Sequence, residues 1–588
     1  NPFDPLANST VQDGDINAAL DGGTSVTITT GTGGNPAAGN ITFAAGASIV
    51  RSKGAAPLTF ELDAAHSIGT SGGASIQSNS GALDVVFNAG VGGQGGAINY
   101  NGVINTNGGN VTMNADAGAS STPAITMNGT SIDTRTTALG DAGPGGSVRI
   151  SGRRTLPASI FNTQATVDLT GISIQSSTGD VSISGVGQHG DGVRIQGGST
   201  PSQILTTSGD IDILGVGASY TYSQSQLAVQ SVEINGATLR SVDGNIGIRG
   251  LVTPGPQDAS SGGVLLAGNA LVTTLGVGNI DIAGESQANG TGVNIVKGAQ
   301  VIGNRDVVLR ASNDGTSDAI AIGGNVHASG VLNLRPGGVD AASGNAVDRT
   351  ANPVTLGGTA ATGFALSADE FGRLDAPTIV VGSNAHAADI DVVGPLSLSS
   401  ALTLQNEGGG NINLGGALTA PKIGLLSRGS ITQTAAAPIT AGTLMARSTG
   451  GSVLLDQAAN NVSAATVGGG AAGAFRYVDV DTVQLGSVSV TGFDAAGNAP
   501  QVASATSMAA DTVFVRTLSG DLLLGTNVSS TNGTDLVAGS RLQNLGGYTI
   551  TGAPWRVWAD TWVGETRGGL QGSGIYPYLY HCAYSGLC

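Results

Sequence analysis

A short motif recurs along the chain: a turn that ends in Gly followed by Asp or Asn, and then alternating apolar residues. Clear copies are STGDVSISG (177–185), TSGDIDILG (207–215), VDGNIGIRG (242–250) and VGNIDIAG (277–284). The residue after Gly is Asp180, Asp210, Asn245 and Asn279 in turn, so the copies are 30, 35 and 34 residues apart. Periods of this size are typical of solenoids, propellers and arrays. The repeat therefore predicts a stack of similar units.

Each copy follows two further apolar pairs, as in GVRIQGG and then SQILTTSGDIDI. Alternating Val, Ile and Leu can face inward while Ser, Asp, Arg and Gln face outward. The pattern predicts an all-β fold, a right-handed parallel β-helix with about three short strands per coil. A propeller needs a recurrent aromatic in each blade, and aromatics make up only 4% of this chain. A series of β-sandwich domains remains the structural alternative.

Glycine and Asx residues at the corners fit tight bends between sheets. We expect corner glycines to adopt positive φ, a conformation that β-branched residues resist. Asp180, Asp210 and Asp212 are also candidates for a row of carboxylates on successive coils, as calcium binding or acid/base catalysis requires. The equivalent later positions are Asn245 and Asn279, however, which favours a role in turns.

Changes in loop content, in the regularity of the coils and in aromatic content divide the chain into three predicted parts. Residues 1–365 predict a β-helix with loop insertions, and 366–545 predict more regular coils. All three Trp and five of the nine Tyr lie in the last 41 residues, so 546–588 form a separate segment. We expect this segment to be an aromatic C-terminal cap, because the open end of a β-helix exposes unpaired strand edges.

The aromatic tail also supplies the candidate site residues. They are predicted to form a cap or, alternatively, a platform for glycan stacking: Trp555, Trp558, Trp562, Tyr576, Tyr578 and Tyr580. The two cysteines, Cys582 and Cys588, are close enough to form a disulfide loop. A disulfide of this kind is typical of an oxidising compartment, and thus of an extracellular protein.

Charge and hydropathy disfavour two classes of partner. The net charge is −17 and only 11% of residues are charged, with no run of Lys or Arg that could follow a phosphate backbone. We therefore expect no nucleic-acid binding. Apolar runs are too short for a membrane span. The chain begins at Asn1 without Met or a signal peptide, which suggests that it is processed or excised.

No convincing catalytic set is visible in the sequence. The five histidines are scattered without metal-ligand spacing: His66, His189, His327, His386 and His581. The doublet Arg153 and Arg154 could meet an anionic glycan, but a solvated turn is the simpler interpretation. We predict no enzymatic activity and no catalytic, cofactor-binding or metal-binding residues.

The opening STVQDGDINAALDGGTSVTITTGTGG, the middle SITQTAAAPITAGTLMARSTGG and the tail ITGAPWRVWADTWVGETRGGL with YLYHCAYSGLC resemble a known family. These segments are similar to the filamentous-haemagglutinin-like large exoproteins that Gram-negative bacteria secrete by the two-partner route. The resemblance implies export through an outer-membrane two-partner secretion transporter, folding at the cell surface, and a role in adhesion, aggregation or biofilm. The secretion domain of such exoproteins is not found, and relatives continue beyond the Cys loop, which suggests a segment of a longer polypeptide.

The sequence thus predicts a non-enzymatic, secreted or surface-exposed structural and adhesive rod. Self-association into fibres and binding to cell-surface or matrix glycans are its expected interactions. The alternatives are a β-helical polysaccharide-degrading enzyme, which rests on fold analogy, and a carbohydrate-binding module centred on Trp555, Trp558 and Trp562.

Overall fold

The computed structural model describes residues 9–30, 39–136, 140–155, 164–188, 190–218, 220–222, 225–227, 229–254, 261–287, 290–314, 317–358, 363–463, 466–552, 554–570, 578–581 and 584. At 140–142, 220–222, 225–227 and 578 only the backbone is described. The chain divides into two compact units: unit 1 is Asn1–Ser329 with Gly337–Val347, and unit 2 is Gly330–Pro336 with Asp348–Cys588. The domain limits expected at residues 366 and 546 stay predictions.

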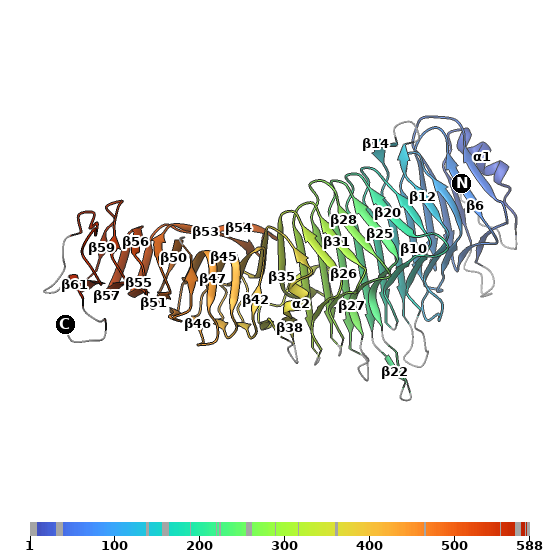
Figure 1. Cartoon of the computed structure of the whole chain (residues 1–588). Helices are drawn as coiled ribbons and strands as arrows, with labels where there is room; N and C mark the ends of the chain where they lie inside the picture. Colours follow the sequence, from blue (N-terminus) through green and yellow to red (C-terminus); the bar gives the residue numbers. More distant parts are fainter. Residues whose placement is uncertain are drawn as a thin grey trace. The chain divides into compact units, whose positions relative to one another are not determined.

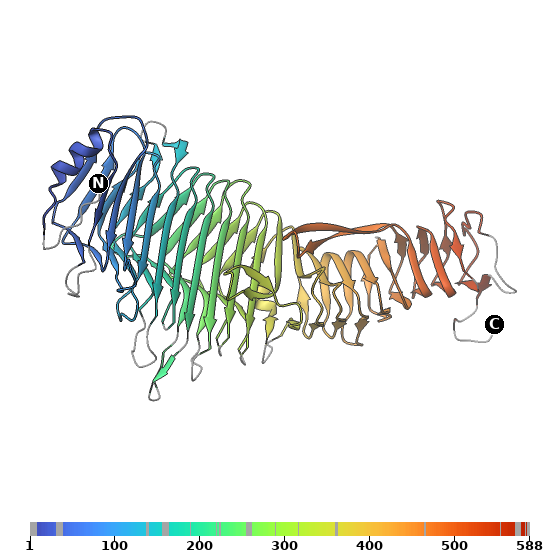
Figure 2. The ribbon, with the colours of Figure 1, turned by 180° about the vertical axis from the view of Figure 1, so that it is seen from behind.

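Unit 1 is a parallel β-helix in which the chain visits three sheets in turn (Figures 1 and 2). The first sheet contains β1 (Val26–Thr29), β4 (Leu58–Ala64), β7 (Leu83–Ala89), β10 (Val111–Asp116), β15 (Val148–Arg154), β18 (Val181–Gly187), β21 (Ile211–Ala218), β26 (Ile246–Thr253), β29 (Ile280–Ser286) and β32 (Val307–Asn313). The second contains β2 (Ile41–Phe43), β5 (Ile68–Thr70), β8 (Ile98–Tyr100), β11 (Ile125–Asn128), β16 (Val167–Thr170), β19 (Val193–Gln196), β24 (Gln230–Asn235), β27 (Gly262–Ala267), β30 (Val293–Ile295) and β33 (Ile320–Ile322). The third contains β3 (Ser48–Arg51), β6 (Ala74–Ser78), β9 (Gly102–Asn105), β12 (Ser131–Asp133), β17 (Ser173–Gln175), β20 (Ser202–Thr206), β25 (Ala237–Ser241), β28 (Leu271–Thr274), β31 (Gln300–Gly303) and β34 (Asn325–Ala328).

Parallel pairing between successive coils confirms the β-helix and its three strands per coil. Val181 of β18 pairs with Ile211 of β21, which pairs in turn with Ile246 of β26. Parallel ladders of this length exclude a series of antiparallel β-sandwiches. Two antiparallel hairpins, β13 (Arg135–Thr136) with β14 (Gly140–Gly145) and β22 (Tyr220–Tyr222) with β23 (Ser225–Leu227), are inserted between the strands of the stack.

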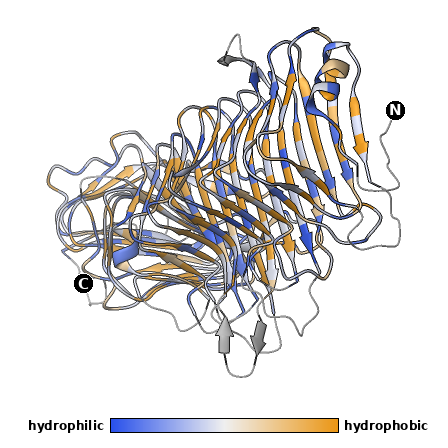
Figure 3. Ribbon diagram, turned by 90° about the vertical axis from the view of Figure 1, so that its right-hand side faces the viewer, coloured by the Kyte–Doolittle hydropathy of each residue, from blue (hydrophilic) through white to orange (hydrophobic). Residues whose placement is uncertain are grey.

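Columns of identical or similar side chains form the core of unit 1. Two inward columns of the first sheet are at most 1% exposed and consist of Phe60, Val85, Val111, Val148, Val181, Ile211, Ile246, Ile280 and Val307, and of Leu62, Phe87, Met113, Ile150, Ile183, Ile213, Ile248, Ile282 and Leu309. Burial of each such side chain contributes roughly 1.5–3 kcal/mol. The alternation of apolar and polar residues along the strands is visible in Figure 3.

The corner before the first sheet explains the order of residues in the motif. Thr206 donates its hydroxyl hydrogen to the carbonyl oxygen of Gly209 at 2.6 Å. Asp210 then presents its Oδ1 to the next coil, where it accepts from the backbone N–H of Asn245 at 2.7 Å. The same contact joins Asp180 to the N–H of Asp210 at 2.9 Å and Asn245 to the N–H of Asn279 at 3.0 Å. We call this row the Asx ladder.

The glycine of the motif is required by close approach. The expected positive φ is wrong for Gly179, Gly209, Gly244 and Gly278, which do not adopt it. A Cβ on Gly209 would lie 2.0 Å from the carbonyl oxygen of Gly179, a distance that real Cβ atoms essentially never show. The glycines stack directly upon each other, so successive coils can approach to the roughly 4.8 Å spacing of paired strands.

A helix covers the edge of β3 in unit 1. In α1 (Asp13–Asp21), the residues Asp13, Asn17 and Asp21 are spaced by four and therefore share one face. Asn17 Oδ1 accepts from Val50 N at 2.7 Å, and Asp21 Oδ1 accepts from Ser52 N at 2.6 Å. Asp13 Oδ2 accepts from Ser48 N at 3.3 Å. The helix thus satisfies donors at a strand edge that would otherwise be open, and sequence reasoning missed it.

Unit 2 is built of shorter parallel coils. Its strands are β37 (Val354–Leu356), β38 (Phe364–Leu366), β39 (Leu374–Asp375), β40 (Thr378–Ser383), β41 (Ile390–Val392), β42 (Leu396–Ser397), β43 (Ala401–Asn406), β44 (Ile412–Leu414), β45 (Leu418–Ser427), β46 (Ile431–Gln433), β47 (Ile439–Ser448), β48 (Val453–Leu455), β49 (Asn461–Val462), β50 (Thr466–Ala471), β51 (Ala474–Asp479), β52 (Val483–Gly486), β53 (Val488–Asp494), β54 (Ala499–Ala505), β55 (Met508–Thr517), β56 (Leu522–Gly525), β57 (Val528–Ala538), β58 (Leu542–Gln543), β59 (Ile550–Thr551), β60 (Trp555–Ala559) and β61 (Tyr578–Tyr580). A short helix, α2 (Ala368–Phe371), begins at a capping box formed by Ser367 and Glu370. The strands β35 (Val331–Val339) and β36 (Ala346–Asp348) contain residues of both units.

The Asx ladder has a counterpart in unit 2. Asp389 Oδ1 accepts from Asn411 N, 22 residues later, and Asn411 Oδ1 accepts from Ser430 N, 19 residues later. Coils are shorter here because one long strand replaces two: β45 pairs with β42 through Leu418 and Thr419, and with β43 through Leu402–Asn406 opposite Ile423–Ser427.

Candidate functional site

The predicted aromatic residues occupy different environments in unit 2. Trp555 is 3% exposed and Trp558 is 8% exposed, so neither offers a free ring face for stacking. Trp558 packs with Val478, Phe514 and Val537, and the ring of Tyr584 lies edge-on at 5.5 Å from it. Its Nε1 donates to Asp535 Oδ1 at 3.3 Å. Trp562, in contrast, is 62% exposed.

Of the remaining candidate residues of the aromatic tail, only Tyr580 has a side chain that the structure describes. Tyr580 donates its hydroxyl hydrogen to Glu565 and accepts from Arg567 Nη2 at 2.6 Å. Burial raises the pKa of Tyr580 to about 12. Tyr578 begins β61 with only its backbone described, and Tyr576 lies outside the described residues. Cys582 and Cys588, predicted to form a disulfide, also lie outside the described residues.

The carboxylates considered for calcium or catalysis are used in contacts between coils. Asp180 and Asp210 belong to the Asx ladder, and Asp212 forms an ion pair with Arg249 at 2.6 Å. Among the described residues, no group of three or more His, Cys, Asp or Glu side chains could hold a metal ion. The row that the motif predicts does align in space, and its oxygens accept backbone N–H groups.

The solvated turn expected around Arg153 and Arg154 is wrong for Arg154. This residue ends β15 with a side chain that is 0% exposed, and its Nη2 donates to Gln164 O at 2.6 Å. Burial lowers the pKa of the Arg154 guanidinium to about 10, an effect opposed by the nearby Asp191. The last residue of a strand in this sheet can point inward, which the doublet alone does not reveal; Arg153 is exposed as expected.

Four histidines occupy separate places, and His189 lies outside the described residues. His66 contacts Gly95 O through Nδ1 at 3.1 Å, His327 contacts Ser329 Oγ at 3.2 Å, and His581 lies 3.8 Å from Asp560. His386 is 2% exposed, and burial lowers its pKa to about 4.

Sequence reasoning also missed the antiparallel hairpin of β53 and β54, which lies across the outer faces of β40, β43, β45, β47 and β50 (Figure 1). On its underside Val488 and Val490 pack with Leu426 and Met445. The coils leave room for it: a Cβ on Gly424 would lie 2.9 Å from Val490 Cγ2. Two alternating runs around DAAGN (494–498) are the signal that could have predicted this hairpin.

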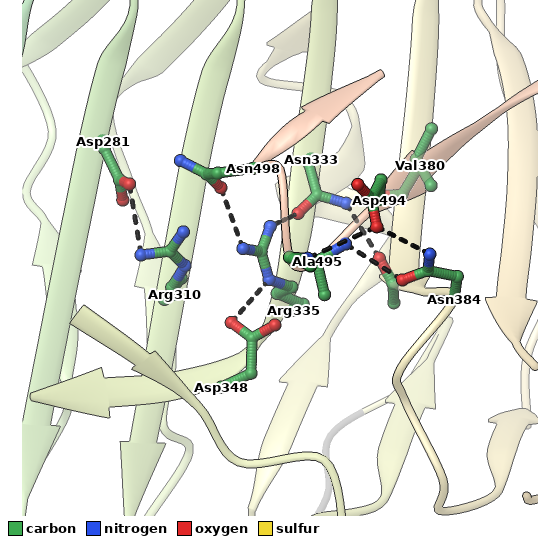
Figure 4. A network of polar contacts seen from close by, with 12 residues as sticks. Asp281, Arg310, Asn333, Arg335, Asp348, Val380, Asn384, Asp494, Ala495 and Asn498 are labelled. Atoms are coloured by element: carbon green, nitrogen blue, oxygen red, sulfur yellow. Dashed lines mark hydrogen bonds and ion pairs between the residues drawn. The ribbon is translucent and has the colours of Figure 1, made fainter. Parts of the chain in front are cut away.

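A buried polar network fastens the tip of the hairpin (Figure 4). Arg335 is 1% exposed and lies between three polar side chains. Its Nε pairs with Asp348 Oδ1 at 2.8 Å, its Nη2 donates to Asn498 Oδ1 at 2.9 Å, and its Nη1 donates to Asn333 Oδ1. The guanidinium also lies over the Phe493 ring, 4.9 Å from its centroid.

A second anchor lies beside the first. Asn384 Nδ2 donates to Asp494 Oδ1 at 2.8 Å, and Asn384 Oδ1 accepts from Ala495 N at 2.9 Å. The hydrogen bond from Asn384 lowers the pKa of Asp494. Phe493 N donates to Gln405 Oε1 at 2.7 Å. These contacts join residues more than 80 positions apart and hold the hairpin against the coils.

A groove runs between β53 and the coils beneath it. It has a volume of about 310 Å³ and is lined by Pro377, Thr378, Ala401, Thr403, Lys422, Ser489, Val490, Thr491 and Val502. Thr378, Ala401 and Lys422 occupy one row on successive strands β40, β43 and β45. Lys422 Nζ donates to the carbonyl oxygen of Ser489 at 3.4 Å. The groove is therefore a small recess with a mixed polar and apolar lining, which includes one cation and no acidic residue.

Comparisons with known proteins give no assignment: no family model, curated protein or solved structure matches this chain. Neither helix in the described part of the chain is long and apolar enough to cross a membrane.

Proposed function

We propose that this protein is a non-enzymatic, extracellular structural and adhesive protein, in which stacked coils support an exposed binding surface. The observation that carries the proposal is the use of surface charge to join one coil to the next. Six arginines pair with a carboxylate on the neighbouring coil: Arg194 with Asp168, Arg249 with Asp212, Arg310 with Asp281, Arg476 with Asp456, Arg541 with Asp521, and Arg556 with Asp535. Arg447 reaches Glu407, which lies two coils back.

Such pairs contribute modestly when exposed, in the range of about 0.2–1 kcal/mol each. Their value here lies in their arrangement, because a solenoid is stabilised by contacts between nearest neighbours. Every coil that receives an ion pair in addition to its Asx-ladder hydrogen bond resists separation from the coil before it. A stack reinforced in this way suits a protein that must bear load.

The extracellular and adhesive part of the proposal rests on the resemblance to two-partner exoproteins and on the low charge of the chain. Export through an outer-membrane two-partner secretion transporter, self-association into fibres and contact with cell-surface or matrix glycans belong to the same proposal.

Adhesion measurements test it. Beads coated with the purified full chain should bind to each other or to bacterial surfaces, whereas beads coated with the heat-denatured chain should not. In parallel, the chain should release no new reducing ends or unsaturated sugars from a panel of acidic polysaccharides. Absence of adhesion contradicts the adhesive role, and release of sugar products establishes the polysaccharide-degrading alternative instead.

A further inference from the structure

We propose that the groove beside β53 binds one acidic sugar residue of a polysaccharide, with Lys422 as the partner of its carboxylate. The inference deepens the proposed adhesive function and rests on it for the class of ligand. Its basis is the set of hydrogen-bonding groups that the hairpin presents to the groove on the side facing the coils.

The free edge of β53 supplies a backbone donor and acceptor. In an antiparallel pair, alternate residues direct their N–H and C=O groups toward the partner strand and away from it. Phe493 bonds away from β54, because its N–H donates to Gln405 and its C=O accepts from Asn384 N at 3.0 Å. Ser489 likewise directs its C=O to Lys422. Thr491 lies midway between them, so its N–H and C=O face the groove.

This arrangement disfavours the addition of a peptide strand. A strand that joins an edge needs free groups on several alternate residues, but Phe493 is already bonded on this side and the C=O of Ser489 is taken by Lys422. Only Thr491 presents both of its groups to the groove, with no intramolecular partner for them on that side among the described residues. One donor and one acceptor suit a small polyhydroxylated ligand better than an extended chain.

The lining adds the remaining features of a sugar site. Thr378, Thr403 and Thr491 line the groove, and their hydroxyls have no intramolecular hydrogen-bond partner among the described residues. Each hydroxyl can both donate and accept, as sugar hydroxyls do. Pro377 and Val502 supply apolar surface for the C–H groups of a ring; Val502 is 70% exposed. The volume of about 310 Å³ lies at the lower end of the range for small-ligand sites.

Lys422 selects the acidic class of sugar. Its ammonium carries three donors, of which one contacts Ser489 O. No Asp or Glu lines the groove to neutralise the charge. In a chain with a net charge of −17, a cation in the lining of this recess provides local attraction for a carboxylate that the rest of the surface repels.

Isothermal titration calorimetry on the full chain tests the proposal with a galacturonate tetramer and its methyl ester, which has the same shape without the charge. We expect the acid to bind at least tenfold more tightly than the ester. Lys422→Gln should remove that preference and leave the weak binding of the ester unchanged. Lys297→Gln, an exposed lysine of unit 1, should bind like the wild type.

Thr491→Pro removes the free N–H together with the side-chain hydroxyl and should weaken binding of both ligands; proline is tolerated where a strand N–H faces outward. Thr491→Val removes the hydroxyl alone, so the difference between the two variants gives the contribution of the N–H; the valine variant also serves if proline disturbs the hairpin. Absence of binding at millimolar tetramer, or equal binding by Lys422→Gln, overturns the site. Binding of an extended peptide without sugar binding overturns it in favour of strand addition. If adhesion of the coated beads persists while sugar binding is absent, the sugar site is refuted and the adhesive function stands. If the sugar binds and is cleaved, the sugar site stands and the non-enzymatic adhesive function is refuted.

Discussion

Replacement of Gly209 by Ala should separate two neighbouring coils of unit 1. The added Cβ would lie 2.0 Å from Gly179 O and 2.6 Å from Gly179 C, well inside ordinary contact. The coils must move apart by more than about 1 Å, because non-bonded carbon contacts lie near 3.5 Å. Three hydrogen bonds depend on the present spacing: Gly209 N to Ser177 O, Asp210 N to Asp180 Oδ1, and Val181 N to Asp210 O.

The expected destabilisation follows from these contacts. Loss or stretching of two of these three hydrogen bonds removes about 2 kcal/mol, and overpacking adds about 1–3 kcal/mol. The total is roughly 3–5 kcal/mol, which corresponds to a more than hundredfold increase in the equilibrium constant for local opening. The matched control is Gly69→Ala within β5, where the nearest atom to the new Cβ is Asn99 O at 4.0 Å.

Hydrogen exchange followed by mass spectrometry provides the assay, because it reports each strand separately. Peptides from β18 and β21 should exchange at least a hundredfold faster in the Gly209→Ala variant, while peptides from unit 2 should be unchanged. Gly69→Ala should retain wild-type protection. If Gly209→Ala exchanges like the wild type, or if both variants lose protection equally, close approach is not the reason for glycine in the motif.

Three further expectations concern other parts of the fold. The pKa of buried His386 is lowered to about 4, so the folded state favours the neutral imidazole. The contribution of His386 to the free energy of unfolding is therefore complete above the unfolded pKa near 6.5 and is lost as the pH falls toward 4. Urea denaturation followed by Trp fluorescence should show that the free energy of unfolding of unit 2 falls by roughly 3 kcal/mol across that pH window. If a His386→Leu variant shows the same pH dependence, His386 is not its source. Arg335→Met should release the hairpin tip, so proteolysis near Asn498 should be faster while hydrogen exchange at β46 changes little. Lys297→Gln is the control. If the tip of the Arg335→Met variant resists proteolysis as well as that of the wild type, Arg335 does not anchor the hairpin. Asn17→Leu should leave Val50 N without its acceptor and destabilise the α1 contact by about 1–3 kcal/mol, seen as faster exchange in α1 and β3 only; unchanged exchange there argues against an edge-capping role.

Much of unit 1 could be predicted from sequence because its repeat is local. The motif that places Asp180, Asp210, Asn245 and Asn279 at intervals of 30, 35 and 34 residues is the same one that forms the Asx ladder. The alternation of apolar and polar residues along each strand determines which side chains enter the core. The stated reason for the glycine was nevertheless wrong, since a sequence shows that a side chain is absent and not which atom would have met it.

The place of the hairpin on the coils, and with it the groove, could not be predicted in the same way. Arg335 meets Asn498 across 163 residues, and Asn384 meets Asp494 across 110. Such contacts are created by the stacking of coils and have no local signal. The helix α1 is a similar case: its capping role depends on β3, which lies more than 25 residues further along the chain. Burial of Arg154 also depended on which way the strand end turned.

The Asx ladder has a consequence for how such a chain can change in length. In the ladder, each coil accepts from its successor and donates to its predecessor through the same atoms, so its consecutive coils meet in the same way at this corner. Gain or loss of one whole coil by recombination therefore rejoins the ladder without a mismatch, whereas a partial insertion must leave the stack as a loop. The hairpin β22–β23 shows the second outcome: it lies between Ile211 and Ile246, which still pair directly. A polypeptide of this kind can evolve in steps of one coil, and each step preserves the register of all the others.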